Sequence, residues 1–100
     1  MIGAAFGLVS FYNRLMENDV KYRQLCWHSR RGMLELDLVL EPFVTQRYRL
    51  LAAEDQARFE SLLECEDTEL FSYFLGRVVP PDEDNAKIVE QILAFARSRN

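Results

Sequence analysis

Cysteine and histidine are scarce in this sequence, and their scarcity excludes several kinds of site. The 100 residues contain two cysteines, Cys26 and Cys65, and one histidine, His28. The cysteines form neither a CxxC pair nor the framework of a small secreted domain, so reduced, buried thiols are expected. Three potential zinc ligands without paired spacing do not predict a metal site. Because His28 has no nucleophile motif or orienting group beside it, we also expect no histidine-based catalysis.

Glycine is also scarce, and no apolar run is long enough for a membrane span. The four glycines are scattered, so no glycine-rich loop is available to cradle a phosphate group. The apolar start MIGAAFGLVSFY is too short to cross a bilayer, and it lacks the basic residues of a signal peptide or mitochondrial presequence. We therefore expect a cytoplasmic protein without membrane insertion. Residues 1–15 are interpreted as an N-terminal extension outside the core, and residues 16–100 as one helical domain.

A basic stripe of the kind that binds nucleic acid is missing as well. The formal net charge is −4, and the two signs are separated along the chain. Residues 14–31 hold five basic and two acidic side chains, whereas residues 54–69 hold seven acidic side chains and one arginine. Nucleic acid is therefore not an expected partner.

What the sequence does contain is a helical pattern of apolar residues. It predicts an all-α fold, a compact single-domain bundle of about five short helices. The expected helices cover residues 17–30, 33–44, 52–64, 67–76 and 83–99. The second of these segments also alternates, with leucines at every other position from Leu34 to Leu40, which taken alone is typical of a strand. A helix is preferred because no second alternating segment could pair with it.

Individual positions in these helices can also be assigned. In the first helix either Trp27 or Ser29 continues the inward-facing pattern of Leu25. Asp67 is expected to cap the fourth helix and Gly76 to end it. The inward-facing residues of the third and fourth helices are predicted to be Ala53, Ala57, Phe59, Leu62, Leu63, Leu70, Phe71, Phe74 and Leu75.

The stretch RRGMLELD, residues 30–37, has a structural interpretation. Gly32 would end the first helix in the left-handed conformation, and Glu35 would fold back onto a free amide at the next helix start. Arg30 and Arg31 would then neutralise the negative end of the first helix. On this interpretation the stretch is an ordinary helix joint.

The same residues also allow a functional interpretation. A glycine at an exposed joint lets another protein approach the backbone closely. Arg31 carries a planar fork that can bind a carboxylate or a carbonyl, and Glu35 could complement a positive group. Glu35 and Asp37 are two positions apart and would point to different faces of a helix, which argues against a catalytic carboxylate pair. The stretch therefore suggests a docking surface rather than an active site.

The segments CWHSRRGMLELD, PF and LLECEDTELFSYFLG, with the proline-bearing joint before the last helix, together resemble the SdhE family. These are small bacterial FAD assembly factors of succinate dehydrogenase. The resemblance covers about residues 21–96 in order, while the apolar start before Met16 is unlike the family. It implies a compact bundle of about five helices. It also implies a chaperone, not an enzyme, that promotes covalent attachment of FAD to the flavoprotein subunit of succinate dehydrogenase, or of fumarate reductase in some bacteria.

The resemblance also implies which residues bind the partner. Arg31, Gly32 and Glu35 take the places of the family's RGxxE motif. The residues that flank this surface are Arg30, Met33 and Asp37. No FAD is expected to stay bound to this chain, which is expected to be a monomer. Arg31→Ala and Glu35→Ala are each expected to weaken partner binding with little change in melting temperature.

An antitoxin-like module and a free flavin carrier are two alternative functions. An antitoxin-like module that neutralises a partner protein is the main alternative, although the sequence shows neither a basic DNA-binding element nor a disordered neutralising tail. A free flavin carrier is the third, and it would require a phosphate cradle or an aromatic cleft that cannot be identified here.

Overall fold

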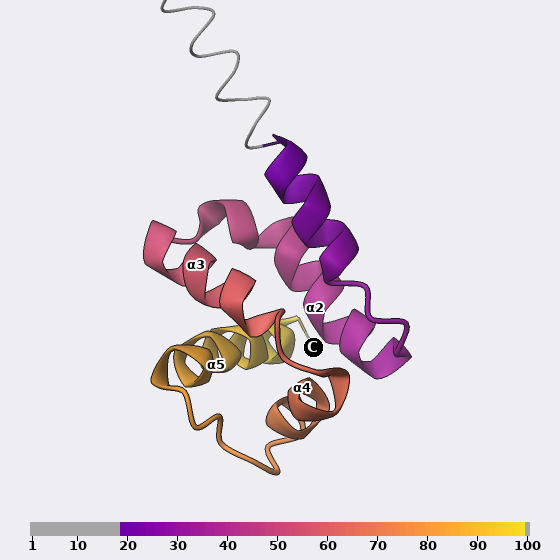
Figure 1. Cartoon of the computed structure of the whole chain (residues 1–100), viewed down its shortest axis with the longest axis vertical. Helices are drawn as coiled ribbons and strands as arrows, with labels where there is room; N and C mark the ends of the chain where they lie inside the picture. The colour runs from indigo at the N-terminus through magenta and orange to yellow at the C-terminus, as the bar shows by residue number, and fades with distance from the viewer. Residues whose placement is uncertain (1–18, 100) are drawn as a thin grey trace, which may run out of the picture.

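The structure is a computed structural model that describes residues 19–99, and within this range it contains helices and connections but no β-strand. The first helix is described over residues 19–28. The later elements are α2 (Leu34–Gln46), the short 3₁₀ helix η1 (Tyr48–Leu50), α3 (Ala53–Leu62), α4 (Asp67–Phe74) and α5 (Glu83–Ser98) (Figure 1). The prediction of a compact all-α bundle of five helices is confirmed. The extension assigned to residues 1–15 lies outside the described residues.

The ambiguous segment is a helix, and its burial pattern explains the alternating leucines. Leu36 and Leu40 are completely buried, whereas Leu34 and Leu38 are exposed. Both pairs are spaced by four residues, so each pair lies on one side of α2. The alternation in the sequence is therefore produced by two opposite faces of a helix, one in the core and one in solvent.

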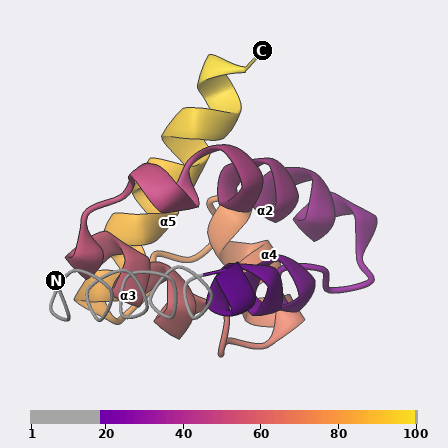
Figure 2. The same cartoon turned by 90° about the horizontal axis from the view of Figure 1, so that it is seen from above.

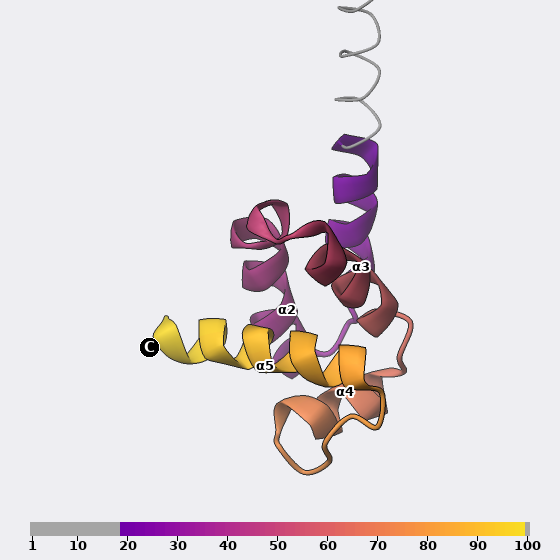
Figure 3. The same cartoon turned by 90° about the vertical axis from the view of Figure 1, so that its left-hand side faces the viewer.

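Helix α5 is the element on which most of the others pack. It contacts α2, α3 and α4, and its buried residues Ile88, Val89 and Ile92 lie at the centre of the core. Figures 2 and 3 show α5 lying across the other helices, with its C-terminal end projecting beyond them. Asp82 caps its start by accepting hydrogen bonds from the backbone amides of Asp84 and Asn85 at 2.8 and 3.1 Å.

Aromatic side chains fill the space between α2, η1 and α3. The rings of Phe43 and Phe59 have centroids 5.4 Å apart, and the rings of Tyr48 and Phe59 have centroids 5.8 Å apart. All three side chains are buried. This cluster fixes the C-terminal half of α2 in the core.

Some of the predicted inward-facing residues are in fact exposed. Ala53 and Ala57 lie on the solvent side of α3, because Phe59, Leu62 and Leu63 direct the other side into the core. Leu75 is exposed because α4 ends at Phe74 and the chain then turns away at Gly76. Gly76 has a positive φ of 72°, which confirms its predicted role at the end of the helix.

Candidate docking surface

The connection between the first helix and α2 is a turn built around Gly32. The first helix ends at residue 28, and the amide of Ser29 still donates to the carbonyl of Leu25 at 2.9 Å. Gly32 follows with a φ of 78° and is exposed. A Cβ atom placed on Gly32 would have no atom within 4 Å apart from those of Gly32 and its two neighbours in the chain. Glycine is therefore required by the backbone conformation rather than by lack of space, and the space beside it is open to another molecule.

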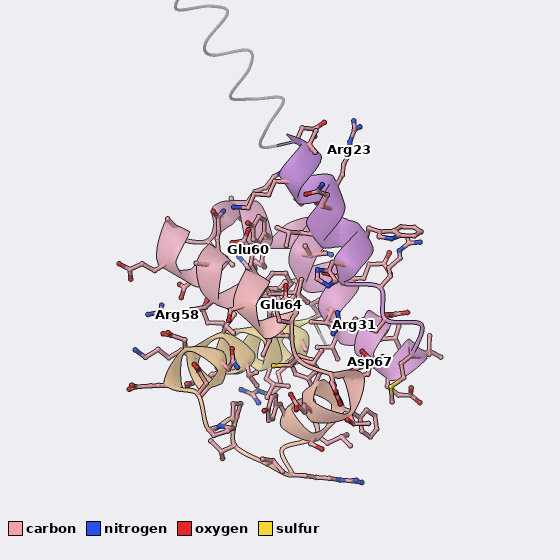
Figure 4. The ribbon with its side chains drawn as sticks, viewed as in Figure 1. Arg23, Arg31, Arg58, Glu60, Glu64 and Asp67 are labelled. Atoms are coloured by element: carbon pink, nitrogen blue, oxygen red, sulfur yellow. The ribbon has the colours of Figure 1, made fainter. Side chains whose placement is uncertain are left out.

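The Arg31 side chain is used inside the molecule. Its Nε donates to Asp67 Oδ1 at 2.8 Å, one terminal nitrogen donates to the Cys65 carbonyl, and the other donates to the His28 carbonyl at 3.2 Å. Only 11% of the side chain is exposed. Figure 4 shows Arg31 and Asp67 side by side, where the connection after the first helix meets the start of α4. The Arg31 guanidinium, which the sequence suggested for binding a partner, therefore binds groups of this chain instead.

This contact also corrects the prediction that Asp67 caps α4. The N-cap residue of α4 is Glu66, and it makes no capping hydrogen bond with its side chain. Asp67 is the first residue of the helix, and its carboxylate accepts from Arg31 instead. A carboxylate in the first turn still suits the positive end of the helix dipole.

The carboxylate that folds back onto a free backbone amide at the joint belongs to Asp37, and not to Glu35 as the sequence predicted. Asp37 Oδ1 accepts a hydrogen bond from the Arg31 amide at 2.8 Å. Met33 is the N-cap of α2 and is half-buried, and the start of this helix has no side-chain cap. Glu35 is exposed and takes no part in holding the joint. Glu35 and Asp37 therefore point apart, as their spacing predicted.

The six predicted partner-binding residues fall into two groups. Arg31, Asp37 and Met33 are half-buried and shape the joint, whereas Arg30, Gly32 and Glu35 are exposed. The exposed Arg30 guanidinium lies 3.3 Å from the Glu41 carboxylate of α2. The structure therefore brings all six together around one turn, but only three of them face solvent fully.

Trp27 is a surface residue that the sequence did not assign to the site. Of the two candidates for the inward position, Ser29 is completely buried, and its hydroxyl donates to the Leu25 carbonyl at 2.7 Å. Trp27 consequently points outward and is 77% exposed. It lines a shallow hollow with His28, Arg30, Arg31 and Asp67. An exposed tryptophan beside the joint is typical of a residue that anchors protein–protein contacts.

Other kinds of chemistry have little support in the part of the chain that the structure describes. No group of three or more His, Cys, Asp or Glu residues is placed to hold a metal ion there. Burial raises the pKa of the Cys65 thiol, and the nearby Glu69 adds to this shift, so the reactive thiolate is disfavoured. Every helix within residues 19–99 is also too short or too polar to cross a membrane. These observations give the described residues no metal-ligand cluster, no activated Cys65 thiolate and no membrane-spanning helix.

Known proteins similar to this chain are FAD assembly factors. Residues 23–96 match the Sdh5 family, described as the flavinator of succinate dehydrogenase. The FAD assembly factor SdhE of Pseudomonas aeruginosa is 53% identical over 78 residues, which cover 78% of this chain and 93% of that protein. SdhE of Shewanella oneidensis is 52% identical over 66 residues, which cover 66% of this chain and 80% of the relative. SdhE of Idiomarina loihiensis is 44% identical over 72 residues.

These matches confirm the resemblance that the motifs around residues 30–37 indicated, and with it the interpretation as an assembly factor rather than an enzyme. The match includes the whole joint, residues 23–28 of the first helix and all of α2. The chain therefore belongs to the Sdh5 family, the flavinators of succinate dehydrogenase.

Proposed function

We propose that this chain is a FAD assembly factor that binds the flavoprotein subunit of succinate dehydrogenase and promotes covalent attachment of FAD to it. The observation that carries this proposal is the family match over residues 23–96. Two independent relatives that are more than half identical bear the name FAD assembly factor. Fumarate reductase is a second possible client class under the same proposal.

The exposed residues of the joint are proposed to contact the client. Gly32 offers an open surface where a client backbone can approach, and Arg30 and Glu35 offer opposite charges on either side of it. Arg31 and Asp37 act through the shape of the joint, because their side chains hold the turn from inside. The hollow beside Trp27 extends the same surface toward the first helix.

FAD is proposed to bind the client and not this chain. The two glycines in the described residues, Gly32 and Gly76, belong to separate joints, so residues 19–99 contain no glycine-rich loop for the pyrophosphate. The flavin and the client supply the bond-forming chemistry. This chain, acting as a cytoplasmic monomer, would contribute binding free energy alone.

Binding can promote attachment by shifting the client between conformations. A partner that binds the attachment-competent state more tightly raises the population of that state. Moving an equilibrium from 1:99 to 99:1 requires about 5.5 kcal/mol of differential binding. A complex with a micromolar Kd has a total binding free energy of about 8 kcal/mol. An interface of ordinary size is therefore sufficient, provided that most of its contacts require the competent state.

A deletion strain tests the proposed function. Covalent flavin on the flavoprotein subunit, read as fluorescence of the denatured subunit in a gel, should fall strongly when the gene is removed. Reintroducing the wild-type gene should restore it. Unchanged flavinylation and unchanged succinate oxidation in the deletion strain would refute the proposal. Recovery of a small toxin in a pull-down, without any flavoprotein, would instead support the antitoxin-like alternative.

A further inference from the structure

An apolar groove runs along α2 directly after the joint. Leu34 and Leu38 are 69% and 64% exposed, and together with Pro42 they follow one another at four-residue spacing. These three side chains therefore lie on one side of the helix, facing away from the buried Leu36 and Leu40. A shallow depression of about 400 Å³ is lined by Leu34, Asp37, Leu38, Glu41, Pro42, Thr45, Gln46 and Arg99. We refer to it as the Leu34 groove.

The exposure of these leucines is not explained by the fold. Single exposed apolar side chains are common on protein surfaces and need no explanation. Here two leucines and a proline share one depression, and the charged residues Asp37, Glu41 and Arg99 lie around them. Exposed apolar side chains next to polar and charged ones are the usual composition of a protein-binding surface.

The groove and the joint are one continuous surface. Arg30 of the joint pairs with Glu41 of the groove at 3.3 Å, and Asp37 of the groove accepts from the Arg31 amide of the joint at 2.8 Å. Leu34 itself comes two residues after Gly32. A protein that covers the open space beside Gly32 must therefore also approach the rim of the groove.

The turn itself exposes no apolar side chain, whereas Trp27 beside it and Leu34 and Leu38 on α2 are apolar and exposed. Its exposed residues Arg30, Gly32 and Glu35 are two charged side chains and a residue with no side chain. Such residues can orient a partner protein and let its backbone approach closely, but stable interfaces also bury a central cluster of apolar side chains. Along α2, Leu34 and Leu38 are the large apolar side chains exposed next to the joint.

We infer that the Leu34 groove receives an apolar segment of the client flavoprotein subunit and supplies the apolar centre of the docking interface. This inference rests on the proposed function, and it identifies where on this chain the client's side chains are buried. Asp37 and Glu41 add negative charge to the lining of the groove and Arg99 adds positive charge, so the fitting segment of the client has aliphatic residues flanked by charges of both signs. A second copy of this chain is the competing occupant.

The test replaces the two leucines by glutamine, which forms helices well and has a similar size. Leu34→Gln, Leu38→Gln and the double variant are compared with Leu50→Gln as a control. Leu50 is 75% exposed on η1 and does not line the groove. Affinity for the purified flavoprotein subunit without FAD, the rate of its flavinylation and the melting temperature are measured for each variant.

The double variant should bind the flavoprotein subunit at least tenfold more weakly than the Leu50→Gln control, while the two melt at the same temperature. If the double variant binds like the control while Gly32→Arg loses binding, the groove inference is wrong and the proposed function stands. If wild-type protein neither binds the subunit nor promotes its flavinylation, the proposed function itself fails.

Sedimentation equilibrium distinguishes a segment of the client from a second copy of this chain as the occupant of the Leu34 groove. Wild-type protein should remain a monomer at micromolar concentration if the groove is reserved for the client. A wild-type dimer that the double variant dissociates, with unchanged client binding, would assign the groove to a second copy and overturn the inference.

Discussion

The Arg31 guanidinium lies 2.8 Å from the Asp67 carboxylate and joins two segments that are 36 positions apart in the sequence. The same side chain donates to the carbonyls of His28 and Cys65, so it connects the end of the first helix, the α3–α4 connection and the start of α4. Because these contacts hold the turn that contains Gly32, they set the position of the proposed docking surface. Arg31 thus combines a structural role with its place in the RGxxE motif.

Arg31→Ala should destabilise the protein. The substitution removes three hydrogen bonds to a largely buried cation, and we expect the free energy of unfolding to fall by about 1.5–3 kcal/mol. This differs from the expectation drawn from the sequence, which predicted little change in stability. Urea denaturation of Arg31→Ala and Arg30→Ala provides the comparison. Arg30 is exposed and forms an exposed ion pair, so its removal should cost about 0–1 kcal/mol. Equal stabilities of the two variants would contradict a structural role for Arg31.

Gly32→Arg should abolish client flavinylation by filling the open space at the joint. Any side chain at a φ of 78° costs about 1–2 kcal/mol, so loss of stability alone must be separated from loss of docking. Gly32→Ala has the same backbone cost without the long side chain and should keep most of the activity. Gly76→Arg has the same cost at a different joint, where φ is 72° and the space is also open. Flavinylation and melting temperature are measured for all three. An inactive Gly32→Ala, or an inactive Gly76→Arg, would show that stability and not docking controls activity.

Glu35→Gln should weaken client binding and leave the fold intact. Glu35 is exposed, and its removal affects stability only through the dipole of α2, an effect of about 0.3–1 kcal/mol. Glu54→Gln is the matched control, because Glu54 is an exposed acid at the second position of α3. Both variants should show the same small decrease in melting temperature, and only Glu35→Gln should bind the client more weakly. Equal client affinity of the two variants would remove Glu35 from the docking surface.

The protein should lose stability at high pH as Tyr48 ionises. Burial, with a further effect of the neighbouring Glu60 carboxylate, raises the pKa of Tyr48 to about 12. The unfolded chain ionises at its ordinary pKa near 10 and so releases the proton first. The stabilisation from neutral Tyr48 is therefore complete below pH 10 and is lost as the pH rises from 10 to about 12. Urea denaturation at several pH values between 9 and about 12 should show a smaller decrease for Tyr48→Phe than for wild type. Parallel pH profiles would contradict this assignment.

Local sequence patterns were sufficient for the architecture. Helical spacing of apolar residues and the scarcity of glycine and proline within segments determined an all-α bundle, and Gly76 marked the end of α4. The motifs in residues 26–37 and 62–76, together with the PF pair and the proline-bearing joint before the last helix, were enough to indicate the family. These features depend on neighbours within one or two turns, which the sequence displays directly.

The tertiary structure decided which side chains of the motif remain exposed. The sequence could not choose between Trp27 and Ser29 for the inward position, and packing buried the small Ser29. It also could not pair Arg31 with Asp67, because that contact depends on how α4 folds back against the first connection. Sequence patterns report the neighbours of a residue along one helix, whereas the partner of a charged side chain is fixed only when distant helices pack. For this reason the sequence by itself indicated the family and singled out residues 30–37, and the structure divided those residues into ones that hold the turn and ones that face solvent.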